Sequence, residues 1–194
     1  DKIVQSNNIY NKFPIILSPV NLLRRKRIEF AIDIVAQLKK DYPDIIYVIS
    51  GKTSKHRKTN DYKAEIMDQI KQLGLEKNVL FLSTLIDRSF KITELHDLYV
   101  LADAVFYFSR HENFGIPIIE APLTKTPIFT SDLDVFHEIA GPLLNYIDPD
   151  KMDAKEASAQ VKKTLESDLI QLNRNVRKTY DLTTILKTHL IPLL

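Results

Sequence analysis

Two carboxylates, Glu112 and Glu120, lie eight positions apart around a Phe-Gly-Ile-Pro sequence. The apolar run 104–108 before them predicts a buried strand, and Pro117 fits the first turn of a helix, where a missing N–H costs nothing. Glu112 is therefore expected on a loop that leaves a strand, and Glu120 about one turn into the next helix. Unpaired N–H groups at a helix start can bind an anion. This layout fits a nucleotide diphosphate between two hydroxyl-bearing rings, with one carboxylate for each ring.

Short apolar segments alternate with amphipathic ones along the chain. Strands are expected at 15–18, 45–49, 79–82, 104–108, 127–130 and 143–146, with helices between them and two more after residue 152, the last near 183–190. Continuously apolar strands between amphipathic helices predict an α/β fold, a Rossmann-like doubly wound parallel sheet of about six strands. Ligands bind such sheets beyond the carboxyl ends of the strands. The loops that leave those ends should therefore share one rim.

Four consecutive cations, Arg24 to Arg27, follow the first expected strand. One interpretation is a solvated helix start. Positive charges at a helix N-terminus oppose the helix dipole, however, so the cluster favours an anionic ligand.

The carboxylate pair and its surroundings resemble the E-x7-E motif of retaining nucleotide-sugar glycosyltransferases, in family 4 (group 1) of the GT-B fold. Tyr99 and Asp103 match the "lY..AD" pattern that precedes this motif in the family. The segments 126–131, 138–139 and 148–149 are similar to the family's following strand and tail. The resemblance covers nearly the whole chain and identifies it as the C-terminal nucleotide-sugar-binding domain, the C-terminal half of a GT-B fold.

The resemblance implies roles for particular residues. Glu120 would accept hydrogen bonds from the ribose hydroxyls, and Glu112 would be the catalytic carboxylate at the transferred sugar. Lys26 matches the lysine that binds the diphosphate. The rest of the implied donor site is Asn113, Phe114, Gly115, Ile116 and Ile86, the last in the segment that binds the base through backbone groups.

Asn21 departs from the family pattern, because an arginine usually stands at this position and also grips the diphosphate. Asparagine donates hydrogen bonds but does not neutralise phosphate charge. Arg24, Arg25 or Arg27 could take the missing role.

The resemblance implies that the full enzyme transfers a hexose from a nucleotide-diphosphate sugar to an acceptor hydroxyl with retention. Residues 1–14 would be an interdomain linker and 15–194 the donor domain. The acceptor domain, which comes first in the family, is absent from this chain, so the fragment alone should bind donor but transfer poorly. Asn21 supports an alternative, a non-catalytic nucleotide-sugar-binding module or partner subunit. A sugar-nucleotide epimerase is a further alternative.

Composition limits the possible partners and cofactors. The net charge of +2 argues for neither nucleic acid nor membrane, and no apolar run approaches the roughly 20 residues of a spanning helix. Membrane contact would belong to the missing half. The lack of cysteine suits the cytoplasm, where we expect the protein. Asp132 and Asp134 form a D-x-D pattern, but Asp134 fits a helix N-cap better than a metal ligand. We therefore expect no cofactor and no metal.

Overall fold

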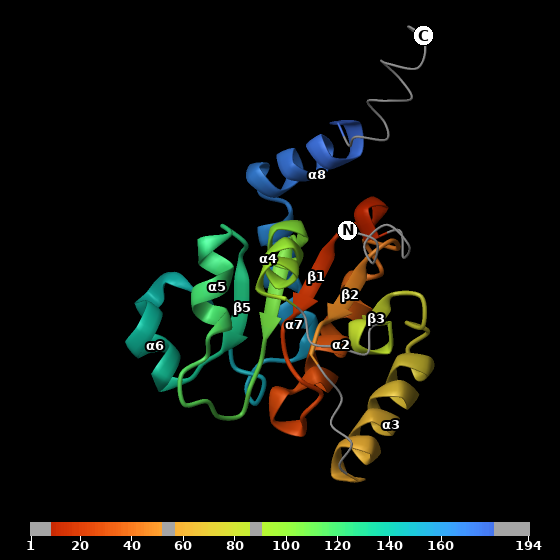
Figure 1. Cartoon of the computed structure of the whole chain (residues 1–194), viewed down its shortest axis with the longest axis vertical. Helices are drawn as coiled ribbons and strands as arrows, with labels where there is room; N and C mark the ends of the chain where they lie inside the picture. Colours follow the sequence, from red (N-terminus) through yellow and green to blue (C-terminus); the bar gives the residue numbers. More distant parts are fainter. Residues whose placement is uncertain (1–8, 52–56, 86–90, 181–194) are drawn as a thin grey trace, which may run out of the picture.

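Six parallel strands form the centre of the molecule in the computed structural model, which describes residues 9–51, 57–85 and 91–180 (Figure 1). They are β1 (Ile15–Ser18), β2 (Ile46–Ile49), β3 (Val79–Phe81), β4 (Ala104–Tyr107), β5 (Ile128–Ser131) and β6 (Asn145–Ile147). The order across the sheet is β3-β2-β1-β4-β5-β6, so the direction of winding reverses between β1 and β4. The predicted doubly wound parallel sheet is confirmed.

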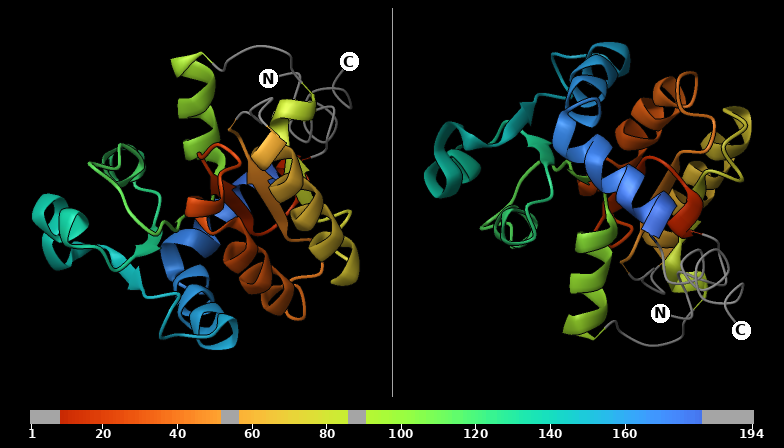
Figure 2. Two further views of the ribbon diagram at one scale, coloured as in Figure 1. Left: turned by 90° about the horizontal axis from the view of Figure 1, so that it is seen from below. Right: turned by 90° about the horizontal axis from the view of Figure 1, so that it is seen from above.

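Helices cover both faces of this sheet (Figure 2). One face carries α2 (Ile28–Leu38), α3 (Arg57–Gln72) and α7 (Ala154–Leu165), and α2 packs against both α3 and α7. The other face carries α4 (Ile92–Leu101) and α5 (Pro117–Leu123), while α6 (Asp134–Ala140) lies beyond β5. The last described helix is α8 (Asp168–Tyr180), and short 3-10 turns are η1 (Ile9–Asn11), η2 (Arg24–Lys26), η3 (Leu82–Thr84) and η4 (Gly141–Leu143).

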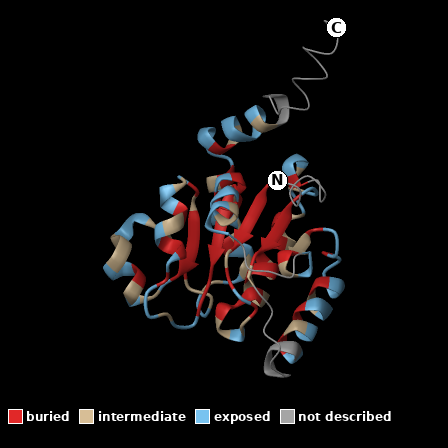
Figure 3. Cartoon of the chain, in the orientation of Figure 1, coloured by how far each residue is buried: buried red, intermediate tan, exposed pale blue. Residues whose placement is uncertain are grey.

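The central strands are buried along their whole length (Figure 3). This explains their continuously apolar sequences, because a sheet covered on both faces has no solvent side. Leu17 of β1 pairs with Val48 of β2 and Val105 of β4, which fixes the register at the centre. Ile9 and Phe13, from the segment expected to be a linker, are also buried in this core.

Four of the expected strands differ from the structure by one residue at one or both ends, and two further expectations were wrong. The last strand was predicted at 143–146, but η4 includes Leu143, which is 86% exposed, and β6 starts only at Asn145. A Gly-Pro pair at 141–142 turns the chain before the strand can begin. Asp134 was predicted to be an N-cap, but it is the first residue of α6, and Leu133 is the N-cap. The expected helix near 183–190 lies outside the described residues.

Candidate functional site

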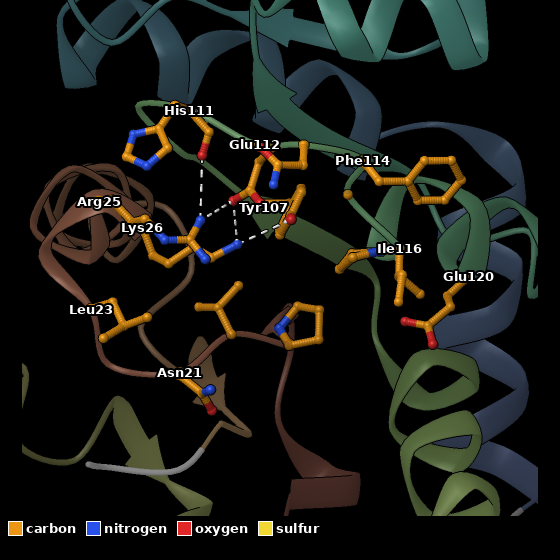
Figure 4. Close-up of a pocket in the computed structure, with 15 residues that line it drawn as sticks. Asn21, Leu23, Arg25, Lys26, Tyr107, His111, Glu112, Phe114, Ile116 and Glu120 are labelled. Carbon is orange, nitrogen blue, oxygen red and sulfur yellow. Dashed lines mark hydrogen bonds and ion pairs between the residues drawn. The ribbon is translucent and has the colours of Figure 1, made fainter. Parts of the chain in front are cut away.

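A cavity of about 670 Å³ opens at the carboxyl ends of β1 and β4, where the strand order reverses. Ligands of doubly wound sheets bind at this point of the fold. The cavity is lined by the predicted site residues Asn21, Lys26, Glu112, Asn113, Phe114, Gly115, Ile116 and Glu120 (Figure 4). Ile86, predicted to contact the base, lies outside the described residues. Loops 91 positions apart in sequence, at Asn21 and Glu112, thus contribute to one site.

Glu112 holds two cations on one side of the cavity (Figure 4). Its Oε1 accepts a hydrogen bond from Arg25 Nη1 at 2.6 Å and another from Lys26 Nζ. Lys26 Nζ also donates to the Tyr107 hydroxyl at 3.0 Å, and it lies 4.4 Å from the centre of the Tyr107 ring. The Lys26 and Glu112 side chains are 8% and 10% exposed. The result is a largely desolvated cluster with two positive charges and one negative charge.

Burial and pairing set the ionisation of this cluster. Burial raises the pKa of the Glu112 carboxyl, but hydrogen bonding and the charges of Lys26 and Arg25 outweigh this effect, so the pKa lies below its ordinary value. Burial lowers the pKa of Lys26, and the hydrogen bond and charge of Glu112 oppose part of that decrease. Burial, followed by the charge of Glu112, raises the pKa of Tyr107. Glu112 is therefore ionised and Tyr107 neutral at physiological pH.

The three arginines around Lys26 occupy different environments. Arg25 lines the cavity. Arg24 is exposed, bonds Glu65 at 2.7 Å and stacks over the Tyr62 ring outside the cavity. Arg27 adopts a left-handed conformation with φ 46°, caps α2 and pairs with Asp150. Arg25 is thus the one of the three arginines that could replace the cation missing at Asn21.

Glu120 lines another side of the same cavity (Figure 4). It lies in the first turn of α5, slightly earlier than the predicted position about one turn into the helix, and Pro117 is at the start of that helix, as expected. Its Oε2 accepts a hydrogen bond from the Tyr99 hydroxyl at 2.7 Å. The helix α5 has only seven residues, so its N-terminus contributes little positive charge. The cations beside Glu112 should therefore attract an anion more strongly than the start of α5 does.

Gly115 allows the loop between the two carboxylates to turn. Its φ is +93°, which residues with side chains rarely adopt, and a Cβ there would lie 2.5 Å from the Phe136 ring. Phe114 and Ile116 on either side are 50% and 61% exposed. The turn therefore leaves apolar side chains at the rim of the cavity.

Sequence reasoning missed Tyr107 and left the choice among the arginines open. Tyr107 is the last residue of β4, so its place at the carboxyl end of an expected strand was the available signal. The contact between Tyr107 and Lys26 joins positions 81 apart, and no local pattern predicts it.

The described part of the chain contains neither a metal-binding cluster nor a membrane-spanning helix. Within 9–51, 57–85 and 91–180, no group of three or more His, Asp or Glu side chains is arranged to hold a metal ion. No helix among these residues is both long and apolar enough to cross a membrane.

This arrangement suits an anion that also carries hydroxyl groups. Lys26 and Arg25 can neutralise phosphate oxygens, which both side chains bind with charged hydrogen bonds. The carboxylates of Glu112 and Glu120 can accept hydrogen bonds from sugar hydroxyls at separate places along the cavity.

Comparison with known proteins gives one family match, over residues 1–180, to glycosyl transferases group 1. Among curated relatives, the O-antigen chain mannosyltransferase RfbU of Salmonella typhimurium (strain LT2) is 33% identical over 117 residues, which cover 60% of this chain and 29% of RfbU. The mannosylglucosylglycerate synthase of Petrotoga mobilis is 32% identical over 161 residues, which cover 73% of this chain and 36% of the synthase. The chain thus spans about a third of the length of these relatives.

The fold also matches solved structures. The crystal structure of Anabaena Alr3699/HepE in complex with UDP and glucose aligns with a TM-score of 0.70 at 24% identity. The alignment covers 99% of this chain and 50% of the Anabaena chain. At this identity the likeness establishes the fold.

Proposed function

Because the chain belongs to the group 1 glycosyl transferases, family 4 of the GT-B fold, we propose that it is the donor domain of a retaining hexosyltransferase. The full enzyme would transfer a hexose from a nucleoside-diphosphate sugar to an acceptor hydroxyl. The observation that carries the proposal is the cavity at β1 and β4, in which two cations lie beside Glu112 and a second carboxylate lines another side.

The cations would stabilise the leaving group. In the transfer, the bond between the sugar C1 and the diphosphate oxygen breaks, the acceptor oxygen bonds to C1, and the acceptor hydroxyl gives its proton to the departing diphosphate. Negative charge develops on the diphosphate as it leaves, and preorganised cations in a desolvated site stabilise such charge strongly. Lys26 and Arg25 both donate hydrogen bonds to Glu112 Oε1. The diphosphate would therefore compete with Glu112 for these two cations.

The two carboxylates would bind different ends of the donor. We assign Glu120 to the ribose diol, because it lines the cavity and makes no ion pair among the described residues. Glu112 would contact the transferred sugar next to the diphosphate, which agrees with its position beside Lys26 and Arg25. The loop of Asn113, Phe114, Gly115 and Ile116 would support the sugar between them.

The relatives suggest which hexose is transferred. RfbU is a mannosyltransferase, and the Petrotoga synthase makes mannosylglucosylglycerate. We therefore propose mannose as the sugar. The Anabaena structure, which contains UDP and glucose, supports a nucleoside diphosphate as its carrier. No metal is part of the proposal, because the cations of the chain can neutralise the diphosphate.

The acceptor would bind in a domain outside this chain. The relatives are about three times longer than the aligned part, and we propose that a preceding domain completes the cleft. The alternative of a non-catalytic module was based on Asn21, but Arg25 provides a second cation in the cavity. The family match favours a transferase over the epimerase alternative.

The decisive experiment uses the full-length protein with a nucleoside-diphosphate mannose and candidate acceptors. NMR of the product gives the anomeric configuration, and an α-linked donor should yield an α-linked product. Lys26→Ala should abolish most transfer, while Arg24→Ala, a change outside the cavity, should preserve it. An inverted product would contradict retention, and full activity of Lys26→Ala would contradict the assigned phosphate site.

A further inference from the structure

The two carboxylates of the cavity are held in different ways. Glu112 has two ion pairs. Glu120 has none among the residues that the structure describes, and the Tyr99 hydroxyl donates a hydrogen bond to its Oε2 at 2.7 Å. The direction of the Glu120 carboxylate therefore depends on a neutral donor rather than on a cation.

Tyr99 is itself buried and packed within the fold. It lies on α4, is 2% exposed, and its backbone carbonyl accepts a hydrogen bond from Thr126 Oγ1 at 2.8 Å. Burial, followed by its hydrogen bond to Glu120, raises the pKa of the Tyr99 hydroxyl, so this group remains a proton donor. Tyr99 does not line the cavity, so it acts on a ligand only through Glu120.

We propose that Tyr99 is a positioning residue for nucleotide recognition, whose hydroxyl holds one oxygen of Glu120 so that the other faces the ribose diol of a nucleoside diphosphate. The inference rests on the function proposed above. A carboxylate has about four acceptor positions, so one bond to Tyr99 leaves enough for two ribose hydroxyls. The fixed carboxylate would discriminate ribose from deoxyribose, because the missing hydroxyl leaves an acceptor unpaired in the bound state.

The competing explanation is that the Tyr99–Glu120 bond only braces α4 against α5. Such a brace would contribute to folding but not to the choice between sugars. Stability alone does not separate these explanations, whereas selectivity for the ribose does.

The test is Tyr99→Phe in the 194-residue chain, with Tyr47→Phe as a matched control. Tyr47 is equally buried, but its hydroxyl bonds Ser18 Oγ at 2.7 Å, and it does not line the cavity. Calorimetry measures the affinities for UDP, GDP and their 2′-deoxy forms. Tyr99→Phe should lower ribonucleotide affinity by about five- to tenfold, which is less than the loss of a whole charged hydrogen bond would cause. It should also reduce the ratio of ribonucleotide affinity to deoxyribonucleotide affinity, called here the ribose-to-deoxyribose ratio. Tyr47→Phe should leave the ratio unchanged.

A double-mutant cycle with Glu120→Gln isolates the route of the effect. If Tyr99 acts through Glu120, Tyr99→Phe should cause no further loss of affinity or selectivity in the Glu120→Gln background. Additive losses, or an unchanged ribose-to-deoxyribose ratio in Tyr99→Phe, would overturn the inference and leave the proposed function intact. Failure of the unmodified chain to bind any of these nucleotides would overturn both.

Discussion

Glu112→Gln is the substitution that best separates the roles of the two carboxylates. It keeps the shape of the side chain and removes the charge that pairs with Lys26 and Arg25. Both cations use the same oxygen, Oε1. The substitution therefore leaves two neighbouring positive charges without their shared counter-charge.

The expected loss of stability follows from burial. Lys26 is 8% exposed, and of its hydrogen bonds to Glu112 and Tyr107 only the one to Tyr107 would be unaffected. Removing one partner of a buried ion pair typically costs about 3–5 kcal/mol. Glutamine keeps an amide oxygen that can accept one hydrogen bond, and Arg25 is one-third exposed. We therefore expect a smaller loss in the free energy of unfolding, about 2–3 kcal/mol.

Nucleotide affinity should not fall together with stability. A bound diphosphate would no longer have to displace Glu112 from Lys26 and Arg25, so the affinity for the bare nucleotide should be unchanged or higher. Saturating nucleotide should also restore stability, by about 2.7 kcal/mol at 100 times the dissociation constant.

Urea unfolding and calorimetric titration with a nucleoside diphosphate measure the two effects, and Glu120→Gln is the matched control. Glu120 makes no ion pair within the described part of the chain, so its substitution should weaken nucleotide binding and change stability little. Stability of Glu112→Gln equal to that of the unmodified chain, together with nucleotide binding weaker than in Glu120→Gln, would refute this reasoning.

Three further predictions concern the cations and the turn. Arg25→Ala should weaken nucleoside-diphosphate binding by about 1.5–3 kcal/mol in calorimetry, whereas Arg24→Ala should not. Equal losses in the two variants would contradict the assignment of the diphosphate contact to Arg25. Gly115→Ala should lower the free energy of unfolding by about 2–4 kcal/mol in urea titrations, because of its positive φ and the clash with Phe136; an unchanged value would contradict the described turn. Burial lowers the pKa of Lys26 from 10.5, and phosphate binds the protonated form of this side chain. The affinity for a nucleoside diphosphate, measured by calorimetry across pH, should therefore be full at neutral pH and fall before pH 10.5. An affinity that stays constant up to that pH would argue against the phosphate contact.

The arrangement of the fold could be predicted from sequence because it depends on periodicity. Apolar runs and helical spacing located the strands, and the handedness of crossovers then determined a doubly wound sheet. The start of β6 was not predicted, because Leu143 and Leu144 look like strand residues, while the turn at Gly141 and Pro142 depends on backbone angles.

Part of the site could also be predicted, because its position follows from the expected sheet. Loops that leave the carboxyl ends of parallel strands must meet, so Lys26, Glu112 and Glu120 could be expected in one cavity. The sequence did not indicate which of the three arginines faces the cavity. Consecutive side chains of a 3-10 turn point about 120° apart, so the identity of the one that faces the cavity depends on where the turn begins. The contact of Tyr99 with Glu120 depends on how α4 and α5 pack, which local sequence does not encode.

The central claim is that the cavity at the carboxyl ends of β1 and β4 binds a nucleoside diphosphate through Lys26. Calorimetric titration of the 194-residue chain with UDP, GDP and ADP in the presence of EDTA tests it directly. We predict saturable one-to-one binding of at least one of these nucleotides without metal, and loss of about 1.5–3 kcal/mol of binding free energy in Lys26→Ala. Absence of binding, strict dependence on a divalent ion, or full affinity in Lys26→Ala would contradict the claim.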